Sequence, residues 1–292
     1  MTELAHGLHG GKLPHVPDSR DWRWEDFRAS LKAAGLLPKI PADHWGHGNT
    51  YKDWLMLANG PDPTAPGKAA EGAGCCVWSS SAHQTMEALT DATFTPEEVA
   101  LVGKLFDGAT TISDYSAVTG YDPTTGEGDN GTEIRAALTY RQTTGIVDTA
   151  GARHKIGPYV AIEPGNLEHL LEALYFFEGL PMGFRVQQAQ MDAFNQAEQN
   201  GTTPVWDYVA GSPEVGGHDI PLVGHPDATD YAALSWAKRL IVTPALITHQ
   251  TDEIWAYASQ ERINTTTGKS RELADQAQLE EYLHLAAKAV AA

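Results

Sequence analysis

The stretch GAGCCVWSSSAHQTMEAL, residues 72–89, holds both cysteines of the chain, Cys75 and Cys76. Apolar residues spaced four, four and three apart follow them, and this spacing predicts one face of a helix. These residues are Trp78, Ala82, Met86 and Leu89. Unpaired N–H groups at a helix N-terminus lower the pKa of a thiol and favour the reactive thiolate. Cys76 is therefore a candidate nucleophile, and a small buried apolar residue is the alternative.

A cysteine nucleophile needs a histidine base, which the fold must bring to it. Of the twelve histidines, His218 stands out because it lies in GGHDIPLVGH, residues 216–225, where the glycines allow another backbone to approach closely. It follows Cys76 by 142 residues (218 minus 76), within the roughly 130–150 residues known for one class of thiol enzymes. His218 is therefore the candidate base.

Six segments, in this order along the chain, resemble a papain-like cysteine peptidase of the compact type found in bacteria and their phages. They are LPHVPDSRDWR (13–23), GAGCCVWSSSAHQTMEAL (72–89), FTPEEVALVGKL (94–105), GDNGTEIRAALTYRQTTGI (128–146), LEHLLEALYFFEGLPMGFRV (167–186), and GGHDIPLVGH (216–225) followed by YAALSWA (231–237). The resemblance covers roughly residues 13–260 and depends on the order and spacing of the segments.

The resemblance implies an α+β fold of two subdomains, one helical and one a twisted antiparallel sheet or half-barrel, with the site in the cleft between them. It implies Cys76 as nucleophile and His218 as base, and it places Cys75 at a position that is usually serine.

The corresponding division of the chain has three parts. They are an extended arm at 1–20, a papain-like domain at 21–260 (helical over about 21–150, sheet over about 151–260) and a C-terminal helix extension at 261–292.

Two departures from the family pattern bear on catalysis. Ala70 stands at the usual position of the glutamine that stabilises the oxyanion, and Leu234 at that of the asparagine that orients the histidine. Loss of one oxyanion donor costs roughly 10²–10³ in rate, and leucine cannot hydrogen-bond an imidazole. Four polar residues could replace them if the fold brings them close: Glu71, Gln84, Asp219 and Asp230.

These departures favour a papain-like fold used as a non-catalytic structural or binding module, and an active thiol peptidase or amide hydrolase is the alternative. The expected partners are other protein subunits, in one version the capsid or tail of a phage virion, or a peptide substrate if the enzyme is active. The formal net charge of −18, from 38 acidic and 20 basic residues, argues against nucleic acid as a partner.

The chain shows no apolar run of the ~20 residues that span a membrane, and its N-terminus lacks the apolar core of a secretory signal. Two adjacent cysteines cannot form a disulfide framework, so we expect synthesis in a reducing cytoplasm. No cofactor is expected. The histidines of DHWGHG (43–48) and the acids of TGYDPTTGEGDNGTE (119–133) lack the spacing of known metal sites, which favours polar loops.

Overall fold

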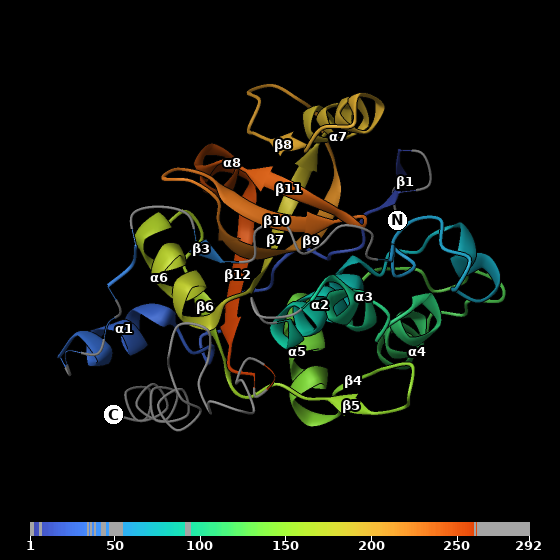
Figure 1. Ribbon diagram of the computed structural model, residues 1–292, viewed down its shortest axis with the longest axis horizontal. Helices are drawn as coiled ribbons and strands as arrows, with labels where there is room; N and C mark the ends of the chain where they lie inside the picture. Colours follow the sequence, from blue (N-terminus) through green and yellow to red (C-terminus); the bar gives the residue numbers. More distant parts are fainter. Residues whose placement is uncertain are drawn as a thin grey trace.

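The computed structural model describes residues 3–5, 8–33, 35, 37, 39–41, 45–46, 55–90, 95–259 and 261. An eight-stranded sheet dominates this part of the chain (Figure 1). Its strands are β3 (Trp45–Gly46), β6 (Tyr159–Ile162), β7 (Leu180–Gln187), β8 (Val205–Trp206), β9 (Glu214–His225), β10 (Tyr231–Ser235), β11 (Lys238–Val242) and β12 (Thr251–Tyr257). Their order is β6-β12-β7-β9-β10-β11-β8, and β3 pairs with β9 outside this path.

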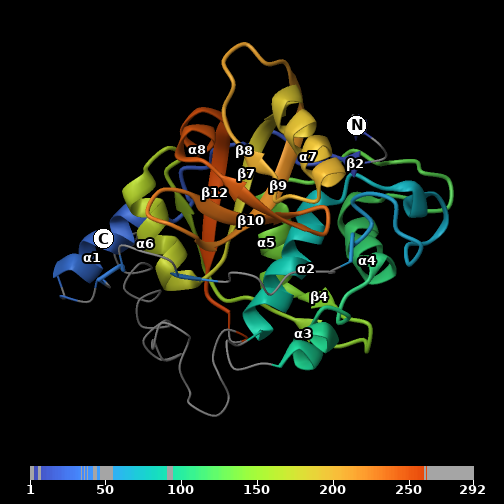
Figure 2. The ribbon, with the colours of Figure 1, turned by 45° about the horizontal axis from the view of Figure 1, so that its top comes forward.

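Helices cover both faces of the sheet. Two short hairpins also form, β1 (Glu3–Ala5) with β2 (Leu8–His9) and β4 (Ile146–Val147) with β5 (Arg153–His154). The helices are α1 (Trp24–Ala33), η1 (Gly67–Glu71), α2 (Cys76–Leu89), α3 (Pro96–Val102), α4 (Gly108–Thr119), α5 (Ile134–Thr143), α6 (Leu167–Phe177), α7 (Gln188–Asn200) and α8 (Pro244–Gln250). Helices α2 to α5 gather on one side of the sheet, and α1 and α6 lie together elsewhere (Figures 1 and 2).

The predicted α+β class is confirmed. The strand pairs are antiparallel as expected, apart from β8, which pairs with β11 in parallel at one edge of the sheet. The segment 231–242 forms the hairpin β10–β11. Its turn residues Trp236 and Ala237 have φ values of 44° and 59°. Positive φ at both turn residues matches the twist of the flanking strands and lets two residues close the hairpin.

Successive residues of β9 point to opposite faces of the sheet, because side chains alternate along a strand. His218, Ile220 and Leu222 face a core built with α1, α6 and α8. Asp219 and Val223 face the second core, which contains α2, α4 and α5. This alternation decides which functional side chains can meet.

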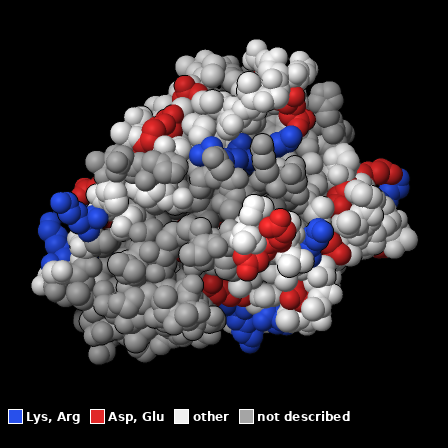
Figure 3. Space-filling model, viewed as in Figure 1, with Lys and Arg blue, Asp and Glu red and all other residues white. Residues whose placement is uncertain are grey.

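In the predicted arm at 1–20, β1 pairs with β2, residues 10–18 form no helix or strand beyond the single bridge of Lys12 to Thr132, and residues 19–20 lie in a turn. The predicted C-terminal helix lies outside the described residues, of which the last is residue 261. Among the described helices, none is long and apolar enough to cross a membrane. Acidic side chains lie in several separate groups on the face that Figure 3 shows, with basic side chains between them.

Candidate thiol site

Cys76 is the first residue of α2, the helix that the spacing of apolar residues after the cysteines predicts. Cys75 is the N-cap residue, and both thiols are free and buried. The loop before the helix is fixed from a distance, since the carboxylate of Asp129 accepts a hydrogen bond from the backbone N–H of Gly74 at 3.1 Å. This contact holds the backbone just before the two cysteines.

The surroundings of Cys76 disfavour the thiolate. Burial, followed by the nearby Asp219 carboxylate, raises the pKa of the Cys76 thiol to about 12. The backbone N–H groups of Asp219 and Gly11 act in the opposite direction and do not offset the burial. The expectation that the helix terminus lowers this pKa is therefore wrong, because desolvation outweighs the partial charge of the helix. Cys76 is a neutral thiol at neutral pH.

His218 lies in an aromatic pocket on the other side of β9. Its ring stacks on Trp236 at a centroid distance of 4.5 Å, with Phe184 and Trp206 at 6.1 and 6.4 Å. Its Nε2 atom lies 2.7 Å from the Oγ atom of Ser235, and its Nδ1 atom has no hydrogen-bond partner among the described residues. Burial lowers the pKa of His218 to about 3, so the imidazole is neutral.

No hydrogen bond joins Cys76 to His218 within the described residues. The neighbour that β9 turns toward the thiol is Asp219, whose carboxylate lies against Ser80 on the next turn of α2. Burial raises the pKa of Asp219 well above its usual range. The fold therefore brings Cys76 to Asp219, and His218 to Ser235.

The two departures from the family pattern have structural counterparts. Leu234 is buried in the core beside α2, and the hydroxyl of Ser235, the next residue, lies 2.7 Å from Nε2 of His218. Ser235 was not identified from the sequence as a contact of His218. The available signal was its position directly after Leu234 and before Trp236. Ala70 lies in η1, and its carbonyl oxygen accepts a hydrogen bond from the Asp62 N–H at 3.0 Å.

Of the four possible replacements, only Asp219 lies beside the thiol. Glu71 is exposed and pairs with Lys68, and Asp230 lies in a turn where its N–H donates to Asp227. Gln84 lies two turns along α2 from Cys76, where its Oε1 atom accepts hydrogen bonds from Arg141 and Tyr257. None of these three replaces the oxyanion donor.

The N-terminal arm covers the thiol. The N–H of Gly11 donates to the carbonyl oxygen of Gly217 at 3.1 Å, and its carbonyl accepts from the N–H of Thr132 at 2.7 Å. Leu13 donates to the carbonyl of Thr132 at 3.0 Å. Residues 10–13 therefore bridge β9 and the loop before α5 directly above Cys76.

Lys12 extends from this segment into an acidic slot. Its Nζ atom lies 2.6 Å from both carboxylate oxygens of Asp252 and 3.0 Å from Oε1 of Glu253, and only 1% of its side chain is exposed. The Oε2 atom of Glu253 accepts hydrogen bonds from the indole of Trp255 at 2.8 Å and pairs with His15 at 3.2 Å.

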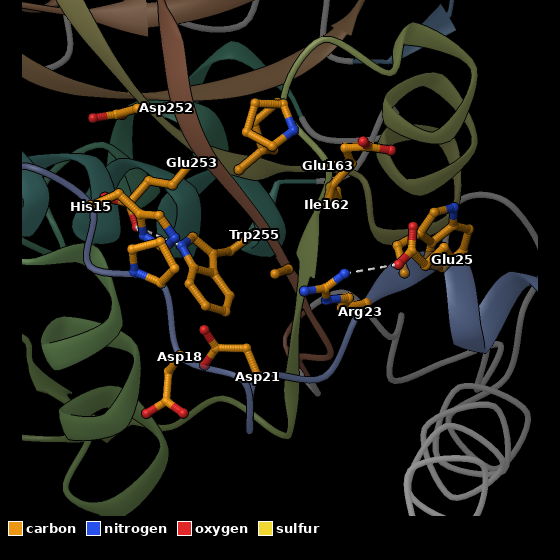
Figure 4. A pocket seen from close by; sticks show the side chains of 15 residues that line it. His15, Asp18, Asp21, Arg23, Glu25, Ile162, Glu163, Asp252, Glu253 and Trp255 are labelled. Atoms are coloured by element: carbon orange, nitrogen blue, oxygen red, sulfur yellow. Dashed lines mark hydrogen bonds and ion pairs between the residues drawn. The ribbon is translucent and has the colours of Figure 1, made fainter.

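Asp252 and Glu253 also line a cavity of about 230 Å³ roofed by the arm (Figure 4). Acidic side chains rim it, together with His15, Trp255 and the Arg23–Glu25 ion pair. Neither Cys76 nor His218 lines this cavity, so it is a separate feature beside the slot.

No group of three His, Cys, Asp or Glu side chains in the described ranges is arranged to hold a metal ion. His44 and His47 lie outside those ranges. In the loop at 119–133, Asp129 binds Gly74 and Tyr115, and Asp122 binds Thr124 and Thr125, so both carboxylates serve the loop structure.

No protein-family model matches the chain, and no curated protein sequence matches it either. Several solved structures match the chain. Xylellain, a cysteine protease from Xylella fastidiosa, is 14% identical, with a TM-score of 0.55 over 87% of this chain and 97% of its own. A procathepsin B from Trypanosoma congolense is 15% identical, with a TM-score of 0.49 over 88% of this chain and 89% of its own. The chain has an α+β architecture with a cysteine at the start of α2, and its fold is papain-like.

Proposed function

We propose that this chain is a papain-like module that binds other proteins and does not hydrolyse peptides. The observation that carries the proposal is the state of Cys76, a neutral thiol sealed beneath residues 10–13. The imidazole that would have to activate it lies on the other face of β9 beside Ser235, and its pKa, lowered by burial to about 3, makes it a weak base. A thiol without a base contributes no nucleophile at neutral pH.

The test is the reaction of the full chain with the epoxide E-64 at pH 6–7, followed by peptide mapping of Cys76. Labelling no faster than that of a small free thiol, and unchanged in His218→Gln, is the expected result. Rapid labelling that requires His218 would overturn the proposal, because it needs a thiolate–imidazolium pair.

A thiol peptidase or amide hydrolase is the second candidate, and one observation favours it. The Nδ1 atom of His218 is buried and has no partner among the described residues, which costs about 1–3 kcal/mol. A rearrangement that carried the imidazole to the face of β9 that Cys76 occupies would satisfy it. Hydrolysis of a fluorogenic peptide library by the parent chain, lost in Cys76→Ser, would establish this function.

The partners in our proposal are other protein subunits, and a phage capsid or tail is the concrete version that the resemblance suggests. Quantitative mass spectrometry of purified particles from the source organism tests that version. Stoichiometric amounts of the chain in the particle would support the virion version. Absence of the chain would rule out that version and would not affect the proposal of a binding module.

A further inference from the structure

The cavity roofed by the arm is enclosed by three segments that lie far apart in the sequence. Residues between 15 and 25 form one wall, residues 161–164 at the end of β6 form the second, and residues 252–255 of β12 form the third. Its volume of about 230 Å³ is below the roughly 300–1,000 Å³ of sites for drug-sized ligands. The cavity therefore suits a small molecule or a single side chain.

The walls of this cavity carry an excess of negative charge. Among the described residues that line it, six carry carboxylates and one, Arg23, carries a permanent positive charge. The six are Asp18, Asp21, Glu25, Glu163, Asp252 and Glu253. Apolar groups complete the walls, including Pro17, Ile162 and Trp255. Acidic and apolar groups together favour a cation with an apolar body.

The chain's own cations leave part of this acidic wall open. Nζ of Lys12 donates to both oxygens of Asp252 at 2.6 Å, but Oε1 of Glu253 is buried and accepts no hydrogen bond from a described residue. Its contact with Lys12 is an ion pair at 3.0 Å. A buried acceptor without a donor is unfavourable, and Glu253 is one of the residues that line the cavity. A ligand that donates hydrogen bonds would satisfy this oxygen.

Glu163 is a second open carboxylate, at the rim. In the described part of the chain, it accepts only a long contact of 3.5 Å from Nδ2 of Asn166. It is exposed and lies across the cavity from Trp255 in Figure 4. Its charge is therefore available to a cation that enters the cavity.

Two residues of the wall already bind a guanidinium. Cζ of Arg135 lies 5.6 Å from the ring centroid of Trp255, and Nη2 of Arg135 donates to the carboxylate of Asp21. Trp255 and Asp21 line the cavity, and Arg135 reaches them from α5. A guanidinium suits such a wall because it is planar and weakly hydrated, stacks on aromatic rings and binds carboxylates through several N–H groups.

An exposed ion pair lies at the mouth of the cavity. Arg23 and Glu25 are 3.2 Å apart, and 62% and 40% of their side chains are exposed (Figure 4). Exposed pairs of this kind contribute little to stability, so an entering cation competes for Glu25 at small cost. The charge of Arg23 opposes a second cation, and its removal should therefore favour binding.

We propose that this cavity binds a guanidinium group, carried by a small molecule or by an arginine side chain of another protein. The carboxylates attract the charge, and the apolar wall residues contact the faces and the stem of the group. Neither Cys76 nor His218 lines the cavity, so the inference goes beyond the proposed function and does not depend on it.

The test is isothermal titration calorimetry of the full chain with n-butylguanidinium at low ionic strength, where charge attraction is least screened. The comparison ligands are n-butylurea, which is planar and uncharged, and n-butylammonium, which is charged and not planar. We expect n-butylguanidinium to bind at least tenfold more tightly than n-butylurea and at least threefold more tightly than n-butylammonium. Absence of binding, or equal affinity for either comparison ligand, would overturn the proposal.

Two exposed residues locate the ligand in this cavity. Glu163→Gln should weaken the binding of n-butylguanidinium at least threefold, and Arg23→Gln should strengthen it. The matched control is Glu71→Gln, which removes an exposed carboxylate outside the cavity and should leave the affinity unchanged. Equal effects of Glu163→Gln and Glu71→Gln would overturn the assignment to this cavity.

A peptide ligand distinguishes the two sources of the guanidinium. Acetyl-Gly-Arg-Gly-amide that binds at least tenfold more tightly than n-butylguanidinium would support an arginine side chain of a partner protein, since the added affinity comes from the peptide backbone. An affinity no tighter than that of n-butylguanidinium would support a small molecule.

Discussion

The Nε2 atom of His218 lies 2.7 Å from the Oγ atom of Ser235, and the imidazole stacks on Trp236. Ser235 and Trp236 end β10 and form its turn, so the hairpin fixes the histidine from the side. The histidine is therefore part of an aromatic core as well as a candidate base. Because the ring is buried and neutral, its contribution to stability depends on pH.

Acid should destabilise the protein through His218. Its pKa is lowered from 6.5 to about 3, so the unfolded chain takes up a proton that the folded chain refuses. The stabilisation is complete above about pH 6.5 and is lost as the pH falls toward about 3. Between pH 7 and pH 4.5, the parent should therefore lose about 2–3 kcal/mol more unfolding free energy than His218→Phe does.

Urea unfolding of parent and variant at pH 7 and pH 4.5 measures this difference. The pKa of His83 is also lowered, to about 4, so both proteins should lose some unfolding free energy in acid through this residue. Phe184→Leu is the matched control, because it disturbs the same aromatic group without removing a titrating side chain. A variant as acid-sensitive as the parent would contradict the prediction.

Ser235→Ala should destabilise the folded state by about 1–3 kcal/mol at pH 7, because it leaves Nε2 of a buried imidazole without a partner. Ser116→Ala is the control, since the Ser116 hydroxyl has no hydrogen-bond partner in the described structure. Chemical denaturation of both variants decides the matter, and equal costs would mean that the Ser235 contact contributes nothing.

Much of the framework could be predicted because its signals are local. The spacing after Cys76 predicts α2, and Asn166 and Thr95 cap α6 and α3 as their positions suggest. Helix α4 escaped prediction although Asp107 forms a capping box at its start, because its sequence GATTISDYSAVT has little apolar periodicity.

The arrangement of the site could not be predicted, because it depends on contacts between distant segments. Identifying His218 does not reveal which face of β9 it occupies, and a shift of one residue reverses every side chain of a strand. The cover over Cys76 joins Gly11 to Gly217 and Thr132, more than 100 residues away in each case. No periodicity encodes such a contact.

Tyr257→Phe should cost about 1–3 kcal/mol of unfolding free energy, because its hydroxyl is buried in a polar network. It donates to Gln84 Oε1 at 2.5 Å and accepts from Arg141 Nη2 at 3.1 Å. Tyr159→Phe is the control, since that hydroxyl contacts Thr139 at the surface and its loss should cost far less. Equal costs in urea unfolding would contradict the predicted role of the network.

Raising the pH should loosen the end of the described chain. His154 bonds to Glu261 and Asp148, and these contacts raise the pKa of its imidazole. A raised pKa stabilises the folded state below about pH 6.5, and that contribution is lost as the pH rises through the folded value. Hydrogen-exchange protection of residues 259 and 261, corrected for intrinsic rates, should fall between pH 6 and pH 9.

The variant His154→Gln cannot titrate and should show the same protection at both pH values. A parent chain with constant protection over this range would exclude the contact as a pH-dependent tether.

Gly131→Ala should expose Cys76. Gly131 has a φ of 81°, and a Cβ atom there would lie 2.1 Å from the carbonyl oxygen of Gly11. Gly151→Ala is a close match, with a φ of 84° and nothing within 4 Å of the added atom. Both substitutions carry the left-handed backbone cost of roughly 1–2 kcal/mol. Only Gly131→Ala also pushes residues 10–13 away from Cys76.

Iodoacetamide labelling mapped separately to Cys75 and Cys76 measures the exposure. We expect Cys76 in Gly131→Ala to react at least tenfold faster than in the parent, and Cys76 in Gly151→Ala to react at the parental rate. Similar acceleration in both variants would mean that general loosening, rather than removal of the cover, exposes the thiol. Acceleration in Gly131→Ala alone would make the segment at residues 10–13 the barrier between Cys76 and solvent.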